Sequence, residues 1–390
     1  MDHPFWRTGF VLTDPKDIDS IRTSAIKEVW IDSKKGLDVR AGEKVILETE
    51  SEAQVDEEVS RVAKASLAVE QVTFAEELGR ASKICSKAEQ AVISMFREGR
   101  MGKAIDTQGV QRVVDEISAS VARNPDALIS LARLKTADSY TYMHSVAVSA
   151  LMLALARQLN LDEQQTSLAG IGGLLHDMGK TFVPNEILNK PGQLTNEEFD
   201  VIKSHPETGF KALQKNPEIN KAVLDIILHH HEKTDGSGYP DKLPEKEISV
   251  LARMSAICDV YDAITSNRPY KAGWDPAESL SRMAEWTDSH LDPRIFQAFV
   301  KSLGIYPIGS LVKLNTDRLG IVVGQSKKSL LTPVVKVFFS SRSKAHIKPE
   351  FIDLSRPGCR ESIVSKEDPA KWNFMDIHEK VAYELIFGRD

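Results

Sequence analysis

The sequence predicts a mainly α-helical protein with a small α/β piece at its N-terminal end and a short antiparallel β appendage at its C-terminal end. Three observations support this class. Apolar residues recur at three- and four-residue spacing from about residue 59 to 305. Strand-like runs flank one helical pattern within the first 45 residues. Short β-prone runs separated by turn residues follow Tyr306.

Residues 1–50 are expected to form a small, partial α/β domain. The runs "GFVL" and "KEVWID" predict strands on either side of a helix that Asp14 caps and Pro15 opens. A piece this short would be marginal as an independent fold. We therefore expect it to pack against the rest of the chain or to lack a strand before Met1. The acidic stretch "ETESEAQVDEE" that follows predicts a solvated linker or exposed first helical turns.

Helices are expected through residues 51–137, a helical linker region, and through 138–307, the main domain. The clearest helical spacing covers 60–96 and 139–159, and breakers such as "RNPDAL" and "QKNPE" separate the helices. Thr195 followed by Glu198 predicts a capping box at a helix start. Residues 308–390 are expected to hold the β appendage, from "SLVKL", "LGIVVGQ" and "PVVKVFF", and a tail without a clear pattern from about residue 356.

Composition narrows the class of protein. The formal charge of -6 argues against a generic nucleic-acid binder. The three cysteines are odd in number and far apart, which predicts no disulfide framework and fits a reducing cytoplasm. No uninterrupted apolar run is long enough to span a membrane, and the polar, aromatic N-terminus is unlike a signal peptide.

Histidines are unevenly distributed. Of ten in the chain, six fall between residues 144 and 231: His144, His176, His205, His229, His230 and His231. Taken singly, each has an ordinary explanation, as a satisfied core residue or, for the run at 229–231, as a helix end that favours positive charge. For Asp259, in the apolar run "LARMSAICDVYDA", the ordinary explanation is a buried hydrogen bond. Together with Asp177, these clusters predict convergence on divalent metal, because imidazole and carboxylate suit Zn, Mn and Fe.

Adjacent donors carry geometric information. Neighbours on a helix point about 100° apart, so His176 and Asp177 suit a helix end or two ions side by side, with the carboxylate holding one ion on each oxygen. Three successive histidines cannot all face one site. One of His229, His230 and His231 is therefore expected to point elsewhere.

Several motifs resemble one family. "HDMGK" is similar to the motif of the HD superfamily of metal-dependent phosphohydrolases, and "HHEKTDGSGYP" matches the HHExxDGxGYP signature of its HD-GYP branch. "HPETG" and "DVYDAITSNRPYKA" also occur in family order, so the resemblance covers about residues 138–307. It implies an HD-type helical bundle and a cyclic di-GMP phosphodiesterase. "HPFWR" and "WIDSKKGLDV" resemble the end of a poorly understood domain often found ahead of HD-GYP.

The resemblance also implies site residues. The family's metal ligands fall on His144, His176, Asp177, His205, His230, His231 and Asp259. Asp177 would bridge two divalent ions, Fe or Mn or another divalent metal, and Lys180 would sit beside the scissile phosphate. Two such ions about 3.5–4 Å apart would hold a bridging hydroxide for in-line displacement. The register of the motif leaves His229 outside the ligand set, as a structural neighbour whose loss should cost little. Tyr140 stands where some members carry a glutamate for a third metal, so two ions are expected.

Substrate contacts are implied for Lys180, Arg268, Lys271 and Tyr239. The ordinary alternatives are a solvated surface pair for Arg268 and Lys271 and a purely structural turn for Tyr239.

The first function expected is hydrolysis of cyclic di-GMP to linear pGpG, GMP or both. The alternatives are a preference for 3′,3′-cyclic GMP-AMP, a weakly active sensor or scaffold, and an HD phosphohydrolase acting on a mononucleotide. A diguanylate cyclase or another signalling protein is a candidate partner through the GYP loop. The sequence leaves open the preferred dinucleotide, the end product, the native metal, the role of the N-terminal domain and the oligomeric state.

Overall fold

A computed structural model describes residues 71–133, 140–188, 190, 192–266, 273–326 and 329–374. The chain divides into two compact units, Met1–Ala68 and Val69–Asp390, and the described residues belong to the second. The strands and helix predicted before residue 51, and the acidic segment after them, lie outside the described residues.

The first described helix falls within the predicted helical pattern at 60–96, of which residues 60–70 lie outside the described residues. Thr73 caps α3 (Phe74–Arg100) in a capping box with Glu76, which ends the extended segment before it. Two further helices follow, α4 (Thr107–Arg123) and α5 (Pro125–Arg133), and both contribute to the same apolar core as the helices after them. The region expected as a helical linker is thus packed into the bundle where it is described.

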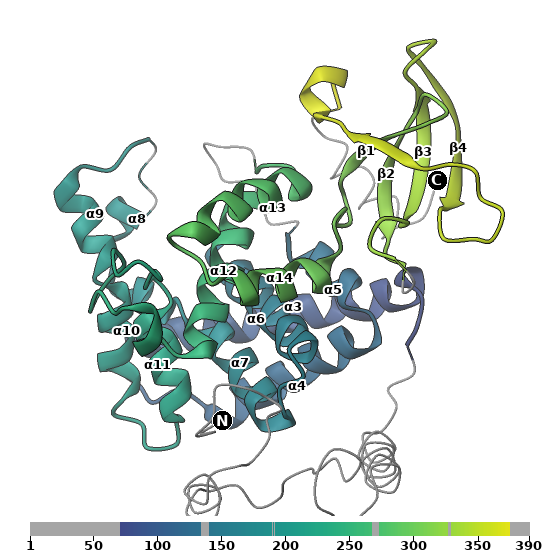
Figure 1. Cartoon of the computed structure of the whole chain (residues 1–390). Helices are drawn as coiled ribbons and strands as arrows, with labels where there is room; N and C mark the ends of the chain where they lie inside the picture. Colours follow the sequence, from purple (N-terminus) through teal and green to yellow (C-terminus); the bar gives the residue numbers. More distant parts are fainter. Residues whose placement is uncertain are drawn as a thin grey trace, which may run out of the picture. The chain divides into compact units, whose positions relative to one another are not determined.

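Helix α6 (Tyr140–Gln158) lies at the centre of the bundle (Figure 1). Its side chains are buried on nearly every face from Met143 to Ala156, which explains the almost continuous apolar run in this stretch. It packs on α7 (Glu163–Leu175), where the Ser149 hydroxyl donates to the Gly170 carbonyl oxygen at 2.8 Å. The expected helical bundle is confirmed.

The helix that carries the "HD" pair ends earlier than predicted. In the sequence, the glycine of "GLLHDMGK", Gly179, predicts the end of this apolar helix. In the structure α7 ends at Leu175, and Met178–Phe182 form a 3-10 helix, η1. Gly179 serves close packing, because a Cβ there would lie 1.8 Å from the His205 carbonyl oxygen. His176 and Asp177 therefore occupy a sharp junction, and α10 lies directly against it.

Among the residues that the structure describes, seven α-helices follow this junction along the chain. They are α8 (Asn185–Leu188), α9 (Asn196–Lys203), α10 (His205–Leu213), α11 (Lys221–His229), α12 (Val250–Thr265), α13 (Pro276–Glu285) and α14 (Pro293–Leu303). Short 3-10 turns occur at Glu245–Glu247, Trp286–Asp288 and Pro369–Trp372. The predicted capping box at Thr195 and Glu198 is confirmed at the start of α9.

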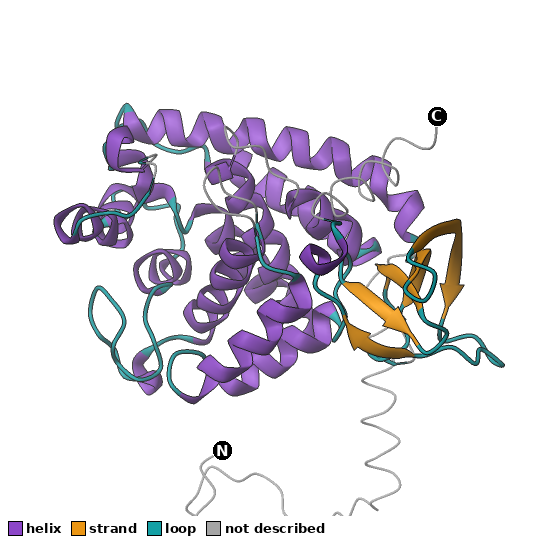
Figure 2. Ribbon diagram, turned by 90° about the horizontal axis from the view of Figure 1, so that it is seen from above, coloured by secondary structure: helices purple, strands orange, loops and turns teal. Residues whose placement is uncertain are grey.

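The predicted β appendage is confirmed as a five-stranded antiparallel sheet of order β4-β3-β2-β1-β5. Figure 2 shows its strands in orange, apart from the purple helices. The strands are β1 (Leu311–Leu314), β2 (Arg318–Gly324), β3 (Val334–Ser340), β4 (Ala345–Asp353) and β5 (Ile363–Lys366). The sequence patterns missed β4 and β5, because most of their residues are exposed and lack the apolar run of a buried strand.

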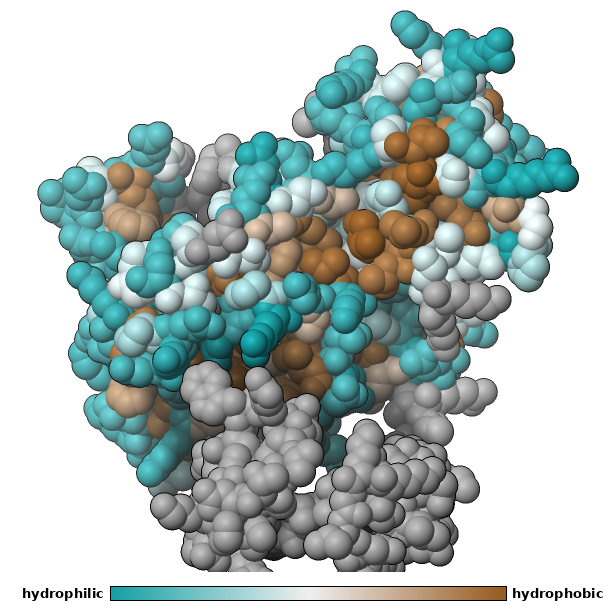
Figure 3. Space-filling view, viewed as in Figure 1, coloured by the Kyte–Doolittle hydropathy of each residue, from teal (hydrophilic) through white to brown (hydrophobic). Residues whose placement is uncertain are grey.

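The surface seen in Figure 3 is largely hydrophilic with local hydrophobic patches. Exposed apolar side chains include Phe199 and Val201 on α9 and Phe351 on β4. Among the described residues, no helix is both long and apolar enough to cross a bilayer.

Candidate metal centre

The predicted metal donors meet at one buried place in the bundle. Their donor atoms form three groups, each with its atoms within 4.8 Å of one another: His205, His230 and His231; His144, His176 and Asp259; and His176, Asp177 and His230. Together these groups contain all the predicted ligands. Segments separated by more than 100 residues, from His144 on α6 to Asp259 on α12, converge here.

Three of the histidines are held in the same way. The Nδ1 atoms of His176, His205 and His230 each donate to the carbonyl oxygen three residues earlier, at 2.8, 2.7 and 2.9 Å. A carbonyl oxygen can only accept, so the proton is on Nδ1. Each ring therefore turns the lone pair of its Nε2 atom into the site, which is the tautomer that metal-ligating histidines adopt.

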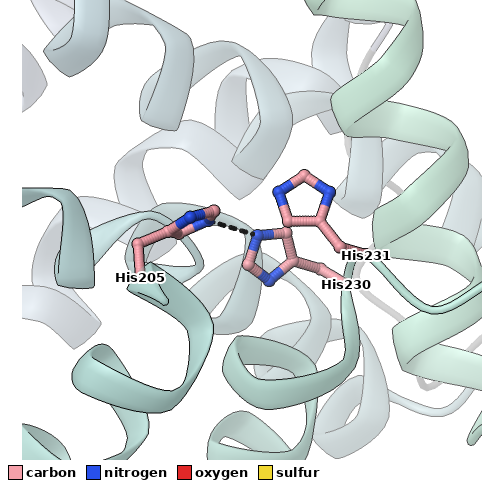
Figure 4. Close-up of side chains that lie close together, drawn as sticks. All are labelled: His205, His230 and His231. Carbon is pink, nitrogen blue, oxygen red and sulfur yellow. Dashed lines mark hydrogen bonds between the residues drawn. The ribbon is translucent and has the colours of Figure 1, made fainter. Parts of the chain in front are cut away.

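These Nε2 atoms lack ordinary partners. The Nε2 atoms of His205 and His230 face each other at 3.1 Å, with His231 beside them (Figure 4). The buried Nε2 atom of His176 has no hydrogen-bond partner in the described part of the chain. Lone pairs that converge without a proton to share are stabilised by a cation, so this donor set fits a divalent metal ion.

Asp177 lies between two of the donor groups. Its Oδ2 atom is 3.5 Å from His144 Nε2 and 3.4 Å from His176 Nε2. Its Oδ1 atom is 3.2 Å from His205 Nε2. Lys180 approaches the same carboxylate, with its Nζ atom 2.6 Å from Oδ2. One oxygen thus faces each side, as expected of a carboxylate set between two ions.

His144 is oriented by a residue that the sequence reasoning missed. Its Nδ1 atom lies 2.6 Å from Asp262 Oδ2, and its Nε2 atom lies 2.9 Å from Asp259 Oδ1. Both carboxylates are on α12, one turn apart, and Asp262 is completely buried. A second carboxylate three residues after Asp259 in an apolar helix was the available signal.

The surroundings of four predicted donors shift their pKa values toward the forms that bind metal. It lowers the pKa of His231 to about 3 and also lowers the pKa of His230 well below its usual value, so both rings stay neutral. Burial acts to raise the pKa of Asp177, but the surrounding His176 and Lys180 outweigh it and lower that pKa overall. For Asp259, burial is likewise outweighed, first by the hydrogen bond to His144, and the pKa is lowered.

His231 is at the open edge of the centre. Its ring stacks on Tyr239 with centroids 4.7 Å apart and an interplanar angle of 27°. Tyr239 is largely enclosed, and this burial raises the pKa of its phenol. The structure thus places the predicted tyrosine beside a predicted ligand.

His229 points away from the centre, which confirms that one of the three successive histidines faces elsewhere. Its Nδ1 atom lies 2.7 Å from Asp225 Oδ1 and its Nε2 atom lies 3.1 Å from Asp241 Oδ2. Burial lowers the pKa of the His229 imidazole, but the hydrogen bonds with these two carboxylates outweigh that effect, so the pKa is raised overall.

Three predicted positions cannot be compared with the structure. Arg268 and Lys271 lie outside the described residues, in the gap at 267–272, and the side chain of Tyr140 is likewise outside them. The two cations directly follow α12, the helix that carries Asp259 and Asp262.

A cavity of about 300 Å³ opens onto the centre. Its polar lining consists of Thr141, His144, Asp177, Lys180, His231 and Asp259. Its apolar lining, which we call the apolar wall, consists of Val260, Ala263, Ile264 and Trp286. This apolar wall was also missed, because Val260, Ala263 and Ile264 follow ordinary helical spacing and Trp286 is far from them in sequence.

Family comparisons agree with this architecture. Residues 117–295 match the HD domain model, and residues 1–110 match the model of a domain of unknown function. A cyclic di-GMP phosphodiesterase of Pseudomonas aeruginosa is 52% identical over 97% of this chain and 90% of its own length. A cyclic di-GMP phosphodiesterase response regulator of Xanthomonas campestris is 36% identical over 49% of this chain and 51% of its own length.

A 3′3′-cGAMP-specific phosphodiesterase of Vibrio cholerae is 34% identical over 43% of this chain and 36% of its own length. The match to the Pseudomonas enzyme spans nearly both chains, and the buried histidines and aspartates converge as an HD site requires. The chain belongs to the HD-GYP family of cyclic di-GMP phosphodiesterases.

Proposed function

We propose that this protein hydrolyses cyclic di-GMP at a centre of two divalent metal ions, Fe or Mn. The observation that carries the proposal is the position of Asp177, whose two oxygens face separate sets of histidine nitrogens. Imidazole-rich donor sets with carboxylates suit these metals. When bound, such ions lower the pKa of water and stabilise charge on a phosphate.

The chain's own residues hold and orient these groups. His144, His176 and Asp259 would ligate on one side of Asp177, and His205, His230 and His231 on the other. Lys180 is 22% exposed at its side chain and lines the cavity, so its ammonium group can reach a phosphate there. It would stabilise negative charge in the transition state or protonate the leaving 3′ oxygen as the P–O bond breaks.

The cavity supports a substrate with a charged and a flat apolar part. A phosphodiester would lie toward Lys180, and one purine would lie against Ile264 and Trp286. Arg268 and Lys271 would contact the second, non-reacting phosphate. Tyr239 would contact the substrate or a partner protein, such as a diguanylate cyclase, at the mouth of the site. A cytoplasmic location is part of the proposal, consistent with the free thiols of Cys85, Cys258 and Cys359.

A second candidate is preference for 3′,3′-cyclic GMP-AMP, because one relative carries that specificity in its name. The two substrates share the same phosphate backbone and differ in one base. The apolar wall offers stacking, which accepts either purine, so the choice depends on polar contacts to the base edge.

The test is a substrate panel with anaerobically purified full-length protein. We expect turnover of cyclic di-GMP to linear pGpG or GMP, faster than of cyclic GMP-AMP, with product identity read by chromatography. Metal content, measured on the same sample, should approach two ions per chain. Binding of cyclic dinucleotide without turnover in the metal-loaded protein would favour the sensor or scaffold and refute the proposal.

A further inference from the structure

Two side chains next to the metal ligands hold one backbone segment. Glu232 follows His231 directly and is only 3% exposed. Its Oε1 atom accepts from the backbone N–H groups of Asp241 and Lys242 at 2.7 and 2.9 Å, and its Oε2 atom accepts from that of Leu243 at 3.1 Å. These three amides directly follow the GYP loop ("DGSGYP", residues 235–240), on the segment that leads back to the bundle.

His229, which precedes His230 and His231 in the sequence, binds the same segment. Its ring lies between Asp225, one turn earlier on α11, and the side chain of Asp241. Asp225 is itself bound by the Ser249 hydroxyl at the start of α12. Asp241 is therefore held twice, by its amide on Glu232 and by its carboxylate on His229. We call His229, Glu232 and Asp241 the loop clamp.

The clamped loop sets the position of His231. The Tyr239 N–H donates to the His231 carbonyl oxygen at 3.3 Å, and the two rings stack. Gly238 packs so closely that a Cβ there would lie 2.4 Å from Lys233 N and 2.5 Å from Glu232 Cα. Because the loop touches the backbone of residues 231–233 at these points, movement of its clamped end would be passed to the His231 and Tyr239 rings.

We propose that the loop clamp positions His231 for metal binding and Tyr239 at the mouth of the site, and that His229 is a positioning residue in this protein. His229 contacts neither a predicted ligand side chain nor the cavity. The sequence predicted that losing it would cost little. Its bond to Asp241 predicts a larger effect, transmitted through the loop. This inference rests on the proposed metal site.

The experiment compares His229→Ala, Asp241→Ala, Asp241→Asn and the double variant His229→Ala/Asp241→Ala. Mn(II) affinity is measured by competition with a chelator, without substrate, alongside kcat and KM for cyclic di-GMP. Partners that orient metal ligands are worth about 10–100-fold in metal affinity or activity. We expect His229→Ala and Asp241→Ala each to lose about tenfold in affinity at the weaker site and in kcat/KM.

Two comparisons separate positioning from a merely structural role. The double variant should lose no more than either single one, because both remove the same bond. Asp241→Asn keeps an oxygen that can accept from His229, so it should stay near wild type. His346→Ala, which removes an exposed histidine from β4, is the control and should match wild type in both assays.

A normal Mn(II) affinity and a normal kcat/KM in His229→Ala, with only a lower melting temperature, would contradict the proposed positioning role of His229. Additive losses in the double variant would do the same. The metal titration needs no substrate, so it still tests the clamp if wild type turns over no cyclic dinucleotide. In that case the proposed function is refuted, and the Mn(II) affinities of the variants alone decide whether the loop clamp positions His231.

Discussion

The helical bundle and the C-terminal sheet bury different kinds of side chain. In the bundle, imidazoles and carboxylates are buried together at one place, among them His176, Asp177 and Asp262. In the sheet, the buried residues are mainly apolar: Leu311, Val312, Leu314, Leu319, Ile321, Val322, Val335 and Val337. Lys336 is a buried exception, and its ammonium group lies 5.8 Å from the Phe351 ring.

This difference separates a functional core from a structural one. Burying ionisable groups is costly unless they are paired or bind a metal, so a cluster of them marks chemistry. In the sheet, the buried side chains stabilise the fold mainly through apolar burial. Changes in the two regions should therefore be distinguishable, with loss of metal and activity in the bundle and loss of folding stability in the sheet.

The largest effect is expected at Asp177. Asp177→Ala removes the carboxylate that faces both histidine sets, so kcat should fall by three orders of magnitude or more, about the scale of losing a central catalytic group. Bound metal should fall with it, while circular dichroism stays that of a folded protein. Full metal occupancy with normal turnover would contradict the two-ion interpretation.

Lys180→Ala should separate charge stabilisation from metal binding. The ammonium group contacts Asp177 but lies at the cavity, so its loss should lower kcat by about 100-fold or more. Metal content, read by elemental analysis, should remain close to wild type. Loss of both ions in this variant would instead assign Lys180 to the support of the centre.

Asp262→Ala tests whether a buried side chain that is not itself a predicted ligand affects metal binding through His144. The variant frees the Nδ1 side of His144, and we expect a loss of about 10–100-fold in metal affinity or activity. Asp262→Asn, which keeps an acceptor oxygen, is the matched control and should lose less. Competition with a chelator measures the metal affinity of each variant. Identical metal affinities in wild type and Asp262→Ala would show that Asp262 does not orient His144 for metal binding.

Leu319→Ala in β2 should show the opposite pattern. Its side chain is fully buried, so the cavity left behind should lower the free energy of unfolding by about 2–5 kcal/mol. Below the unfolding transition, kcat and metal content should be unchanged. A large fall in kcat of the still-folded protein would show that the sheet is coupled to the centre.

Asp126 on α5 should make the free energy of unfolding depend weakly on pH. It accepts a hydrogen bond from the backbone of Gln325, which directly follows β2. Burial raises the pKa of this carboxyl to about 7, opposed by a hydrogen bond from the Gln325 backbone. The folded state therefore holds a proton that the unfolded state releases near pH 4, so stability falls as pH rises from about 4 to about 7. After allowance for solvent screening, the loss should be about 1–2 kcal/mol.

Asp126→Asn cannot ionise, so it should lack this contribution to the pH slope. Chemical denaturation at pH 5 and at pH 7.5 provides the measurement. Parallel slopes for wild type and Asp126→Asn would show that Asp126 ionises at its ordinary pKa in the folded protein.

Local patterns predicted much of the fold because they act over a few residues. The capping box at Thr195 and the strands β1 to β3 follow from side chains near in sequence. The strands β4 and β5 were not predicted, because most of their residues are exposed and show no apolar pattern. Their pairing with β3 and β1 is visible only in the structure. The end of α7 also differed: the helix ends at Leu175, and Gly179 lies beyond it, packed against the backbone of His205.

For the site, the sequence by itself determined the donor types and the motif register that sets His229 apart from His230 and His231. The donor types and the family resemblance predicted that these segments converge, but they did not give the contacts that orient each donor. Only the tertiary structure paired His144 with Asp262 across 118 residues, brought Trp286 and Ile264 into the lining of one cavity, and joined Asp241 to both His229 and Glu232. Hydrogen bonds and packing act over a few ångströms, and in these pairs folding alone brings the partners within that range.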